Sequence, residues 1–284
     1  MLIVFYAGIL CSQQYKLRED LLEPLNGKIY SIFEDSVNNK VYVGGDFNFI
    51  GKGGNSLVKI DTSGIGDLAY PTPNGEIDAI VSDQNKGWYI AGKFTKVGDS
   101  IRYGLAHIDS LGNVTEKLST NNRFIGGQVN ALAFDSGKLY VGGSFKTYGI
   151  STDGYGEVDT VNNYMSVPHP EVIGTVNASV PDGNGGWYIG GDFNKVGDQE
   201  RSNIAHITSD GKVGSWKPYV NGSVGMMKKF GDSIFISGAF TKVGGYNNVG
   251  LAMLNTAGGI YNWNPDIIGT VNDIEVTDDR IIIA

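Results

Sequence analysis

Two histidines occupy matching places in the chain and carry the side chain most often used for acid–base catalysis or metal binding. His107 and His206 each follow an alanine and precede an isoleucine in a short apolar segment. Neither has a second histidine or a cysteine at the spacing of a metal site, and the chain contains one cysteine in all. We therefore expect both histidines to be outward-facing strand residues, with no metal bound.

Aspartates and glutamates are numerous but form no catalytic pattern. Asp46 and Asp192 share a position that is not acidic in other copies of the same phrase. The segment Asp182–Gly186 comes nearest to a calcium loop, but it lacks regularly spaced oxygen ligands and is typical of a hairpin turn. A glycosidase needs two facing carboxylates, and no spacing singles out such a pair. The chain also lacks a Gly-x-Ser-x-Gly elbow and a phosphate-binding loop, so we assign no catalytic residue and expect no cofactor.

Aromatic residues are the candidates for partner binding. Trp216 and Trp263 each stand in a Trp-x-Pro sequence, six residues before a glycine that opens a repeat. Partly exposed tryptophans stack on sugars or anchor protein partners, and packing at an edge of the fold is the alternative. The segment 148–170 departs from the repeat pattern, and loops on rigid scaffolds often carry recognition. Its candidate contact residues are Tyr155, Tyr164 and His169.

The fold that positions these side chains is indicated by a Gly-Gly-x-Phe phrase, which is repeated with small changes along the chain. Its phenylalanines follow one another at intervals of 47 to 51 residues. A fixed period of this size is the signature of a repeat architecture. A residue type shared by all copies builds the repeat, whereas a specific function should lie where the copies differ. The phenylalanines are Phe47, Phe94, Phe145, Phe193 and Phe240.

Each repeat contains four short strand-like segments separated by turn signals, with no competing helical periodicity. Four strands in about 40 to 50 residues is the size of a propeller blade, and a lone blade must bury its faces against neighbours. The sequence therefore predicts an all-β propeller of four-stranded blades, with the repeated phenylalanine between adjacent blades. The predicted blades span about 26–73, 74–126, 127–173, 174–221 and 222–268.

The two ends of the chain predict a sixth blade. Residues 269–284 supply the first two strands of one more repeat, and residues 1–25 align with the third and fourth strands. A blade shared in this way leaves no exposed edge between the first and last blades. The whole chain, 1–284, would then be one six-bladed domain. The alternative is a fragment of a longer repeat protein whose sixth blade is truncated.

A set of mostly polar residues shares one position, next to a valine or isoleucine of the first strand. The first strand of a propeller blade is generally innermost, so these residues would surround the central channel. Their amide and carboxylate oxygens could hold a water or a cation. The alternative is that the asparagines bond backbone groups of neighbouring blades. The residues are Tyr30, Asp78, Asn130, Asn177 and Asn272, with Gly225 at the same position.

The segment from Trp88 to Gly98, followed by Arg102 and by Leu105–Asp109, resembles the delta-60 repeats of bacterial β-propellers. It is also similar to the repeats of fungal Rax2-like cortical polarity markers. The resemblance covers nearly all of residues 26–284 and implies the propeller fold. It implies no particular chemistry, because the bacterial repeats occur in large surface or secreted proteins with no defined shared activity. The arginine before the third strand is matched at Arg102 and Arg201 only.

The composition narrows the class of partner. A net charge of −8 and a pI near 4.9 disfavour nucleic acids and anionic membranes. A hydrophobic content of 41% excludes global disorder. The apolar start, Met1–Leu10, is too short to span a bilayer and lacks a basic signal region, so no membrane insertion is expected.

The function expected from the sequence is a non-catalytic interaction or structural module of a surface, secreted or phage-virion assembly. Its partner would be a protein or a glycan. The alternative is a glycan-acting hydrolase with carboxylates at the mouth of the channel.

Overall fold

A computed structural model gives the fold of most of the chain after residue 26. The predicted strands of residues 1–25 and the ring residue Asn272 lie outside the described residues. The described residues are 27–35, 40–47, 56–61, 70–118, 124–125, 127–145, 147–148, 150–151, 155–160, 164–165, 169–263, 265, 269–271, 273–276 and 281–283.

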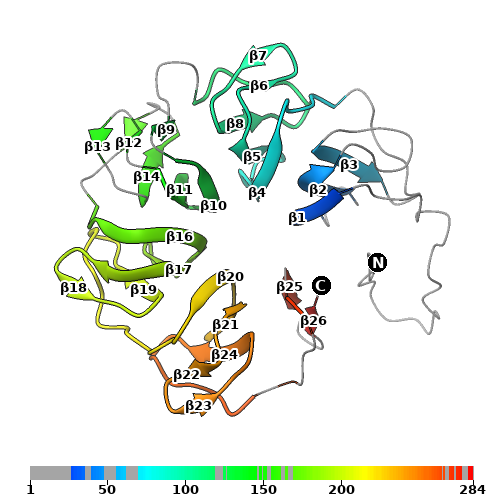
Figure 1. Ribbon diagram of the computed structural model, residues 1–284. Helices are drawn as coiled ribbons and strands as arrows, with labels where there is room; N and C mark the ends of the chain where they lie inside the picture. Colours follow the sequence, from blue (N-terminus) through cyan, green and yellow to red (C-terminus); the bar gives the residue numbers. More distant parts are fainter. Residues whose placement is uncertain are drawn as a thin grey trace, which may run out of the picture.

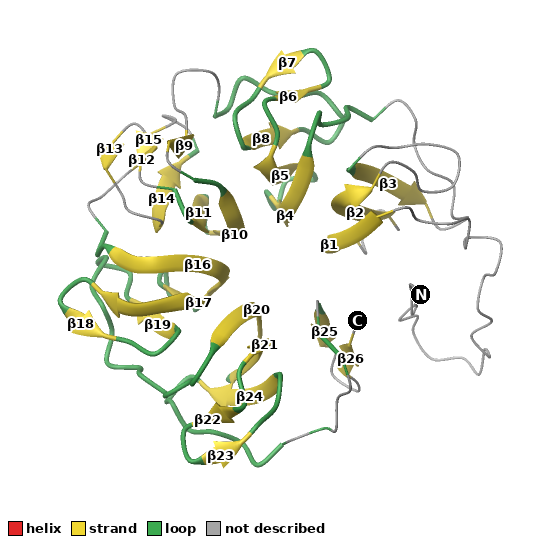
Figure 2. Ribbon diagram, viewed as in Figure 1, coloured by secondary structure: helices red, strands yellow, loops and turns green. Residues whose placement is uncertain are grey.

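Antiparallel sheets follow one another along the chain, one to each repeat, and we number them as blades one to five (Figure 1). The residues described form strands and loops, without a helix (Figure 2). Blade one contains β1 (Gly27–Asp35), β2 (Lys40–Phe47) and β3 (Leu57–Asp61), and blade two contains β4 (Glu76–Ser82), β5 (Trp88–Lys93) and β8 (Leu105–Ile108). Blade three contains β10 (Val129–Asp135), β11 (Lys138–Gly143), β14 (Tyr155–Asp159) and β15 (Tyr164–Met165). Blade four contains β16 (Val172–Pro181), β17 (Trp187–Val196) and β19 (Ile204–Ile207), and blade five contains β20 (Ser223–Phe230), β21 (Ser233–Ala239) and β24 (Leu251–Asn255).

Short hairpins project from the connection between the second and third strands. Further along the chain, a two-stranded sheet follows blade five. The hairpins use β6 (Lys96–Val97) with β7 (Ser100–Ile101), β18 (Gln199–Glu200) with the end of β17, and β22 (Lys242–Val243) with β23 (Tyr246–Asn247). In blade three the hairpin uses β12 (Thr147–Tyr148) and β13 (Ile150–Ser151), and β9 (Phe124–Ile125), which precedes β10, pairs with β12. The last sheet pairs β25 (Ile274–Val276) with β26 (Ile281–Ile283).

The fourth strand of each predicted blade is short wherever the structure describes it. In blade three it is the two-residue strand β15, which pairs with β14. In blades two, four and five it is reduced to one isolated bridge, such as the one between Ile207 and Val213. Pro218 follows Val213 by five residues and has no N–H to donate to a ladder, which limits how far this strand can extend.

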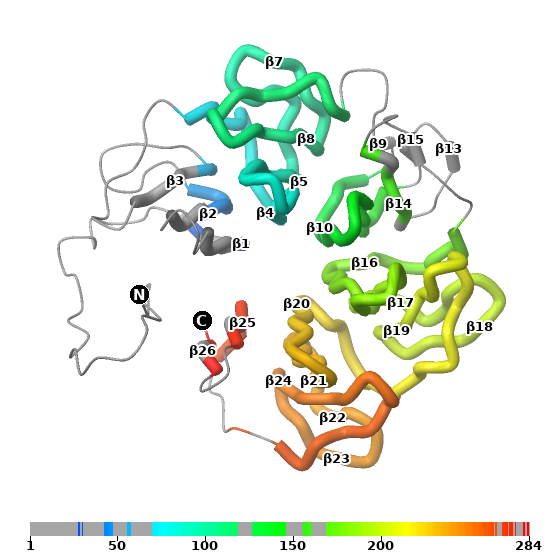
Figure 3. Tube along the Cα trace, turned by 180° about the vertical axis from the view of Figure 1, so that it is seen from behind, coloured from blue at the N-terminus to red at the C-terminus, as the bar shows by residue number. Residues whose placement is uncertain are grey.

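The sheets stand side by side around a common centre, with their first strands innermost (Figures 1 and 3). Contacts run from β1 to β4, β4 to β10, β10 to β16, β16 to β20, and β20 to β25. This is the arrangement of a β-propeller. It confirms the predicted fold class and the predicted place of the first strand.

The hydrophobic cores lie between neighbouring blades. Tyr188 and Ile204 of blade four, for example, share a buried cluster with Val224 and Phe240 of blade five. Similar clusters join blades one and two, two and three, and three and four. The sheet of β25 and β26 packs against blade five in the same way. The repeated phenylalanines belong to this packing, since all five are only 1–4% exposed, as the sequence predicted.

The two glycines of the repeated phrase have different structural roles. A Cβ atom at the first one, Gly190, would lie 2.7 Å from a side-chain carbon of Val224 in the next blade. A Cβ atom at the second one, Gly191, would lie 2.0 Å from the backbone oxygen of Thr175 in the first strand of its own blade. The first glycine therefore allows the close approach of the next blade. The second allows close pairing of strands within a blade.

Candidate functional site

A β-bulge recurs at one place in the first strand of all five described blades. The register between the first and second strands shifts by one residue there. A bulge leaves one residue without a partner in the ladder and bends the strand, which redirects that side chain. Because the first strands are innermost, the bulge residues gather at the axis. They are Tyr30, Asp78, Asn130, Asn177 and Gly225, the described members of the predicted channel ring.

On one side of the axis, amide side chains link neighbouring blades. Nδ2 of Asn130 donates to Oδ1 of Asn177 over 3.3 Å, and Gln128 donates to Oδ1 of Asn130 over 2.8 Å. Nδ2 of Asn177 in turn lies 3.4 Å from Oγ of Ser223 and 3.5 Å from the carbonyl oxygen of Val224. Only the contact with the carbonyl of Val224 reaches a backbone group of a neighbouring blade, as in the alternative considered from the sequence; the other bonds join side chains.

The other side of the axis is acidic. Burial raises the pKa of the Asp78 carboxyl to about 6; Lys93 opposes this rise and Glu76 adds to it. None of the described residues hydrogen-bonds Oδ2 of Asp78. Lys93 instead donates to Oε2 of Glu76 over 2.5 Å. Burial raises the pKa of Tyr30 as well, and the negative charges of Glu76 and Asp46 add to that rise.

Replacing Asp78 by asparagine is expected to stabilise the protein above pH 6 and to have little effect near pH 4. With a pKa of about 6 when folded and 3.8 as the ordinary value, the carboxyl favours folding below pH 3.8. That contribution is lost as the pH rises through 6, because the buried group must then ionise. The gain for Asp78→Asn at pH 8 is about 1–2 kcal/mol after solvent screening. Denaturant unfolding at a series of pH values measures it.

The exposed Asp46 provides the matched control. Asp46→Asn should change the unfolding free energy little at any pH in the series. An equal gain for Asp78→Asn at pH 4 and pH 8 would show that ionisation of this carboxyl is not the cause.

His107 is held by a buried hydrogen-bond network. Its Nε2 lies 2.9 Å from Oδ2 of Asp83, and its Nδ1 lies 2.9 Å from Oγ1 of Thr115. The other carboxylate oxygen of Asp83 accepts hydrogen bonds from the backbone amides of Asn85 and Gly87, each 2.7 Å long. The aspartate thus closes the turn between β4 and β5 and fixes the histidine on β8 at the same time.

The protonation states in this network follow from the pKa shifts. Burial lowers the pKa of His107, against the opposing effect of its hydrogen bond with Asp83. Burial would raise the pKa of Asp83, but the hydrogen bonds it accepts outweigh burial and lower it. A neutral histidine beside a charged aspartate donates from Nε2 to Asp83 and accepts at Nδ1 from Thr115. This Asp–His–Thr order resembles a catalytic triad, but His107 is 2% exposed and out of reach of a substrate, so we interpret the network as structural.

Blade four repeats the pair without its third member. Nε2 of His206 lies 2.9 Å from Oδ2 of Asp182, and the ring stacks on Tyr188 at 4.6 Å. Oδ1 of Asp182 accepts backbone hydrogen bonds within its turn, which confirms the predicted hairpin turn. Gly214 occupies the place of Thr115, since each donates its N–H to the carbonyl of the histidine in its own blade.

The sequence-based prediction for the two histidines is wrong for His107, which is buried, and His206 is half-buried rather than outward-facing. A signal for these pairs is present in the sequence, because both pairs have a separation of 24 residues. In blade three Glu157 takes the histidine position, opposite Tyr140, and its carboxylate lies 3.2 Å from Nζ of Lys138.

Buried arginines at matching places hold the segment of the fourth strand. Nη2 of Arg102 donates to the carbonyl of Thr115 over 2.6 Å, and Nη2 of Arg201 donates to that of Gly214 over 2.7 Å. In blade five Asn248 takes this position and also donates to a carbonyl. The arginines matched in the sequence therefore fasten the outer part of blades two and four.

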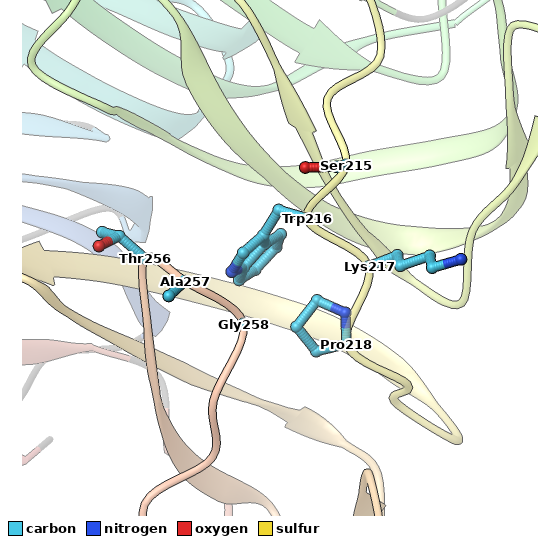
Figure 4. Close-up of a pocket in the computed structure, with 7 residues that line it drawn as sticks. All are labelled: Ser215, Trp216, Lys217, Pro218, Thr256, Ala257 and Gly258. Atoms are coloured by element: carbon cyan, nitrogen blue, oxygen red, sulfur yellow. The ribbon is translucent and has the colours of Figure 1, made fainter.

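The two tryptophans proposed as partner contacts pack at blade edges. Trp216 is 5% exposed, meets Tyr188 edge-on at 4.8 Å and donates from Nε1 to the carbonyl of Asn255. Trp263 is half-buried and meets Phe235 edge-on at 5.6 Å. Beside Trp216 lies a pocket of about 280 Å³. It is lined by Ser215, Trp216, Lys217, Pro218, Thr256, Ala257 and Gly258 (Figure 4).

The candidates of segment 148–170 lie on different elements. Tyr155 begins β14 and pairs with Gly142, at the register position taken by Leu105 in blade two. Tyr164 begins β15 and pairs with Asp159. His169 is half-buried, its ring lies 5.8 Å from that of Trp187, and burial lowers its pKa.

Two further features bear on the class of site. Within the described ranges, no group of three or more His, Cys, Asp or Glu side chains is placed to hold a metal ion. The same residues include no helix long and apolar enough to cross a membrane.

Comparison with known proteins agrees with the architecture. A family model described as a domain of unknown function (DUF5122) beta-propeller matches residues 183–213, which carry the second and third strands of blade four. No curated protein sequence matches the chain. The chain overlays on the WD40 domain of Neurospora crassa Pan2 with a TM-score of 0.53 at 10% identity, over 83% of this chain and 65% of that one. It thus spans slightly less than two thirds of that structure.

Two other solved structures are similar. A gluconolactonase from Xanthomonas campestris, XC5397, gives a TM-score of 0.47 at 13% identity, over 74% of this chain and 69% of that one. A chain of a nidogen/laminin complex gives 0.47 at 10% identity, over 81% and 77%. At these identities the comparisons bear on the fold alone. The arrangement of the sheets and the overlay on the Pan2 domain define that fold as a β-propeller.

Proposed function

We propose that the protein is a non-catalytic interaction or structural module of a surface, secreted or phage-virion assembly, and that it binds a protein or glycan partner. The resemblance of its repeats to delta-60 propellers supports this setting, since those repeats occur in large surface and secreted proteins. A propeller fold is consistent with a protein-interaction module.

The observation that carries the proposal is the use made of the recurring polar side chains. The axial asparagines bond to one another, the histidines bond to turn aspartates, and the arginines bond to backbone carbonyls. These bonds fasten strands and blades together. Specific recognition is then left to other residues, for which we retain Tyr155, Tyr164, His169 and the half-buried Trp263 as candidates. Trp216 was a candidate as well, but it is 5% exposed and packs at a blade edge.

The experiment is to incubate the purified full chain with an array of glycans and with candidate surface proteins, while measuring both binding and product release. We expect saturable binding of a partner that is recovered unchanged. Release of a shortened glycan by the chain would contradict a non-catalytic role.

One observation favours a second function, a glycan-acting hydrolase. Asp78 has a pKa near 6, which suits a general acid at neutral pH, and Glu76 is a second carboxylate close enough to influence it. Under this alternative, Asp78→Asn and Glu76→Gln would each abolish product release from the array while leaving glycan binding in place. If no product is released by the unmodified chain, the alternative is excluded for the glycans tested.

We also propose that the propeller has six blades and that residues 1–25 complete the last one. The sheet of β25 and β26 packs on blade five as a first and second strand do elsewhere, and Oγ of Ser237 donates to the carbonyl of Val271 across that interface. In blades one to five a third strand pairs with the outer side of the second. In the described part of the chain β26 has no such partner, so its edge can accept a strand.

Engineered cysteines test this closure. With Cys11 replaced by serine, Val4→Cys and Ile282→Cys should form a disulfide if residue 4 pairs beside β26, and thermal stability should rise. A control pair, Val4→Cys with Ser233→Cys in blade five, should remain unlinked. Failure of the first pair to link, or equal linking of both, would overturn the closure.

A further inference from the structure

The outer part of blade five carries three exposed tyrosines at positions that are polar or small in blades two and four. Tyr219 lies in the linker before β20, Tyr246 begins β23, and Tyr261 lies in the segment of the fourth strand. Their side chains, together with the nearby Val249, are 39–60% exposed. We call these four residues the tyrosine face of blade five.

Hydrogen bonds establish which residues correspond in the other blades. The hairpin after the second strand contains a valine followed by a glycine, and this hairpin valine is Val97, Val196 or Val243. The carbonyls of Tyr219, Thr72 and Glu171 each accept a hydrogen bond from the N–H of that glycine in their own blade. Tyr246, Ser100 and Gln199 each pair with the hairpin valine itself. Tyr261, Thr115 and Gly214 each donate to the carbonyl at the matching place of the third strand. The positions of the three tyrosines are therefore occupied in blades two and four by threonine, serine, glutamine, glutamate or glycine.

The three tyrosines sit on segments that touch one another. The bridge between Val220 and Val243 fastens the linker to the β22–β23 hairpin. Ile260, the neighbour of Tyr261, packs beneath the hairpin at Gly244. The linker, the hairpin and the fourth-strand segment therefore form one surface at the outer edge of the ring, beside β22 and β23 (Figure 1).

The part of the sequence that carries the tyrosine face has an excess of positive charge, whereas the whole chain is negatively charged. Between Asp210 and Asp266 the only acidic residue is Asp232, which lies in the turn between β20 and β21, at the other end of blade five from the hairpin. The same stretch carries five lysines: Lys212, Lys217, Lys228, Lys229 and Lys242. The chain as a whole has a net charge of −8.

The lysines beside the tyrosine face lack the acidic neighbours found elsewhere. Lys96 in blade two lies 3.4 Å from Asp99, but Gly245 takes the place of that aspartate after the matching Lys242. Lys217, two residues before Tyr219, is also exposed. Among the described residues neither Lys217 nor Lys242 forms an ion pair. The surface thus combines exposed aromatic rings with positive charge.

We infer that the tyrosine face of blade five, with Lys217 and Lys242, docks an acidic protein segment that presents an apolar side chain between its carboxylates. Tyrosines bury large area at low entropic cost and are enriched at binding hot spots. The lysines select a partner of opposite charge and speed its encounter. A second copy of this chain meeting the face through a two-fold axis would place these lysines against each other, which disfavours that occupant. The inference rests on the proposed function and names its partner class.

The test selects ligands from short random peptides displayed on phage, with the purified full chain as bait, and then measures dissociation constants of the selected peptides as synthetic compounds. Tyr219→Thr/Tyr246→Ser/Tyr261→Thr installs the residues that blade two carries at the same positions. Lys217→Glu/Lys242→Glu reverses the charge. Ile101→Asn, at the exposed isoleucine of the blade-two hairpin, is the matched control.

Selected peptides should be rich in aspartate and glutamate around an apolar residue. Both blade-five variants should bind them at least about 10-fold more weakly, the control should bind them normally, and binding should weaken with added salt. Circular dichroism and melting temperature verify that all variants are folded. Absence of any selected peptide, selection of non-acidic peptides, or unchanged binding by the tyrosine variant would overturn the inference.

Two measurements distinguish failure of this inference from failure of the proposed function. If the tyrosine variant still binds the partner found with the glycan and protein array, the protein is a binding module but this surface is not its site. Light scattering of the unmodified chain and of the tyrosine variant examines self-association. A dimer that the tyrosine substitutions dissolve would assign the face to a second copy and overturn the acidic partner.

Discussion

Phe193→Ala is expected to lower the free energy of unfolding by about 3–5 kcal/mol. The ring is 4% exposed and belongs to the cluster that blades three and four share, together with Val176 and Trp187. Truncation removes its contacts and leaves a cavity between two blades that are each fixed by their other neighbours, so the gap cannot close easily. Guanidinium unfolding followed by tryptophan fluorescence measures the loss, with Trp187 as a reporter inside the affected cluster.

The control for this substitution is Phe230, which is 40% exposed at the end of β20. Phe230→Ala removes the same atoms but should cost less than about 1 kcal/mol, because most of the ring already faces solvent. Equal losses for the two variants would contradict the role of the repeated phenylalanine as a filler between blades.

Gly191→Ala is expected to destabilise the protein by about 3 kcal/mol or more, or to prevent folding. The added carbon would lie 2.0 Å from the carbonyl oxygen of Thr175, a backbone atom that cannot rotate away. Relief of the clash requires β16 and β17 to separate beside the bulge at Asn177. The amount of soluble protein and the melting temperature report the effect. The spacing of the axial side chains should change in any variant that still folds.

Gly245→Ala is the control, because a Cβ atom at this position would meet nothing within 4 Å. Its stability should stay within about 0.5 kcal/mol of the unmodified protein or rise slightly, as the unfolded chain becomes less flexible. If Gly191→Ala were equally harmless, the second glycine of the phrase would have no role in strand pairing.

The repeat architecture could be predicted from the sequence because its determinants are local. Strand periodicity, turn glycines and the regular return of Phe47 through Phe240 are all visible along the chain. The burial of these rings and the inner place of the first strands followed correctly. The short fourth strands were harder to predict, because residues such as Val213 have the composition of a strand but make only one bridge.

Partnerships between side chains could not be predicted in the same way. The ring positions were found from the alignment of repeats, but the bonding of Asn130 to Asn177 depends on the distance between two blades. The burial of His107 depends on Asp83, a turn residue 24 positions earlier, and nothing local indicates that one aspartate serves both its turn and a histidine. A bulge shifts the phase of an alternating pattern by one residue, and these strands are too short to establish the phase on both sides of it.

Because each hydrophobic cluster among the described residues joins two neighbouring sheets, none of the described repeats carries a complete folding unit of its own. The stability of each blade should therefore depend on its interfaces with the two neighbouring blades. A destabilising substitution in one blade should weaken the neighbours on both sides. We therefore expect evolution to duplicate or exchange whole interfaces. The second strand of one repeat and the first strand of the next would then be inherited together.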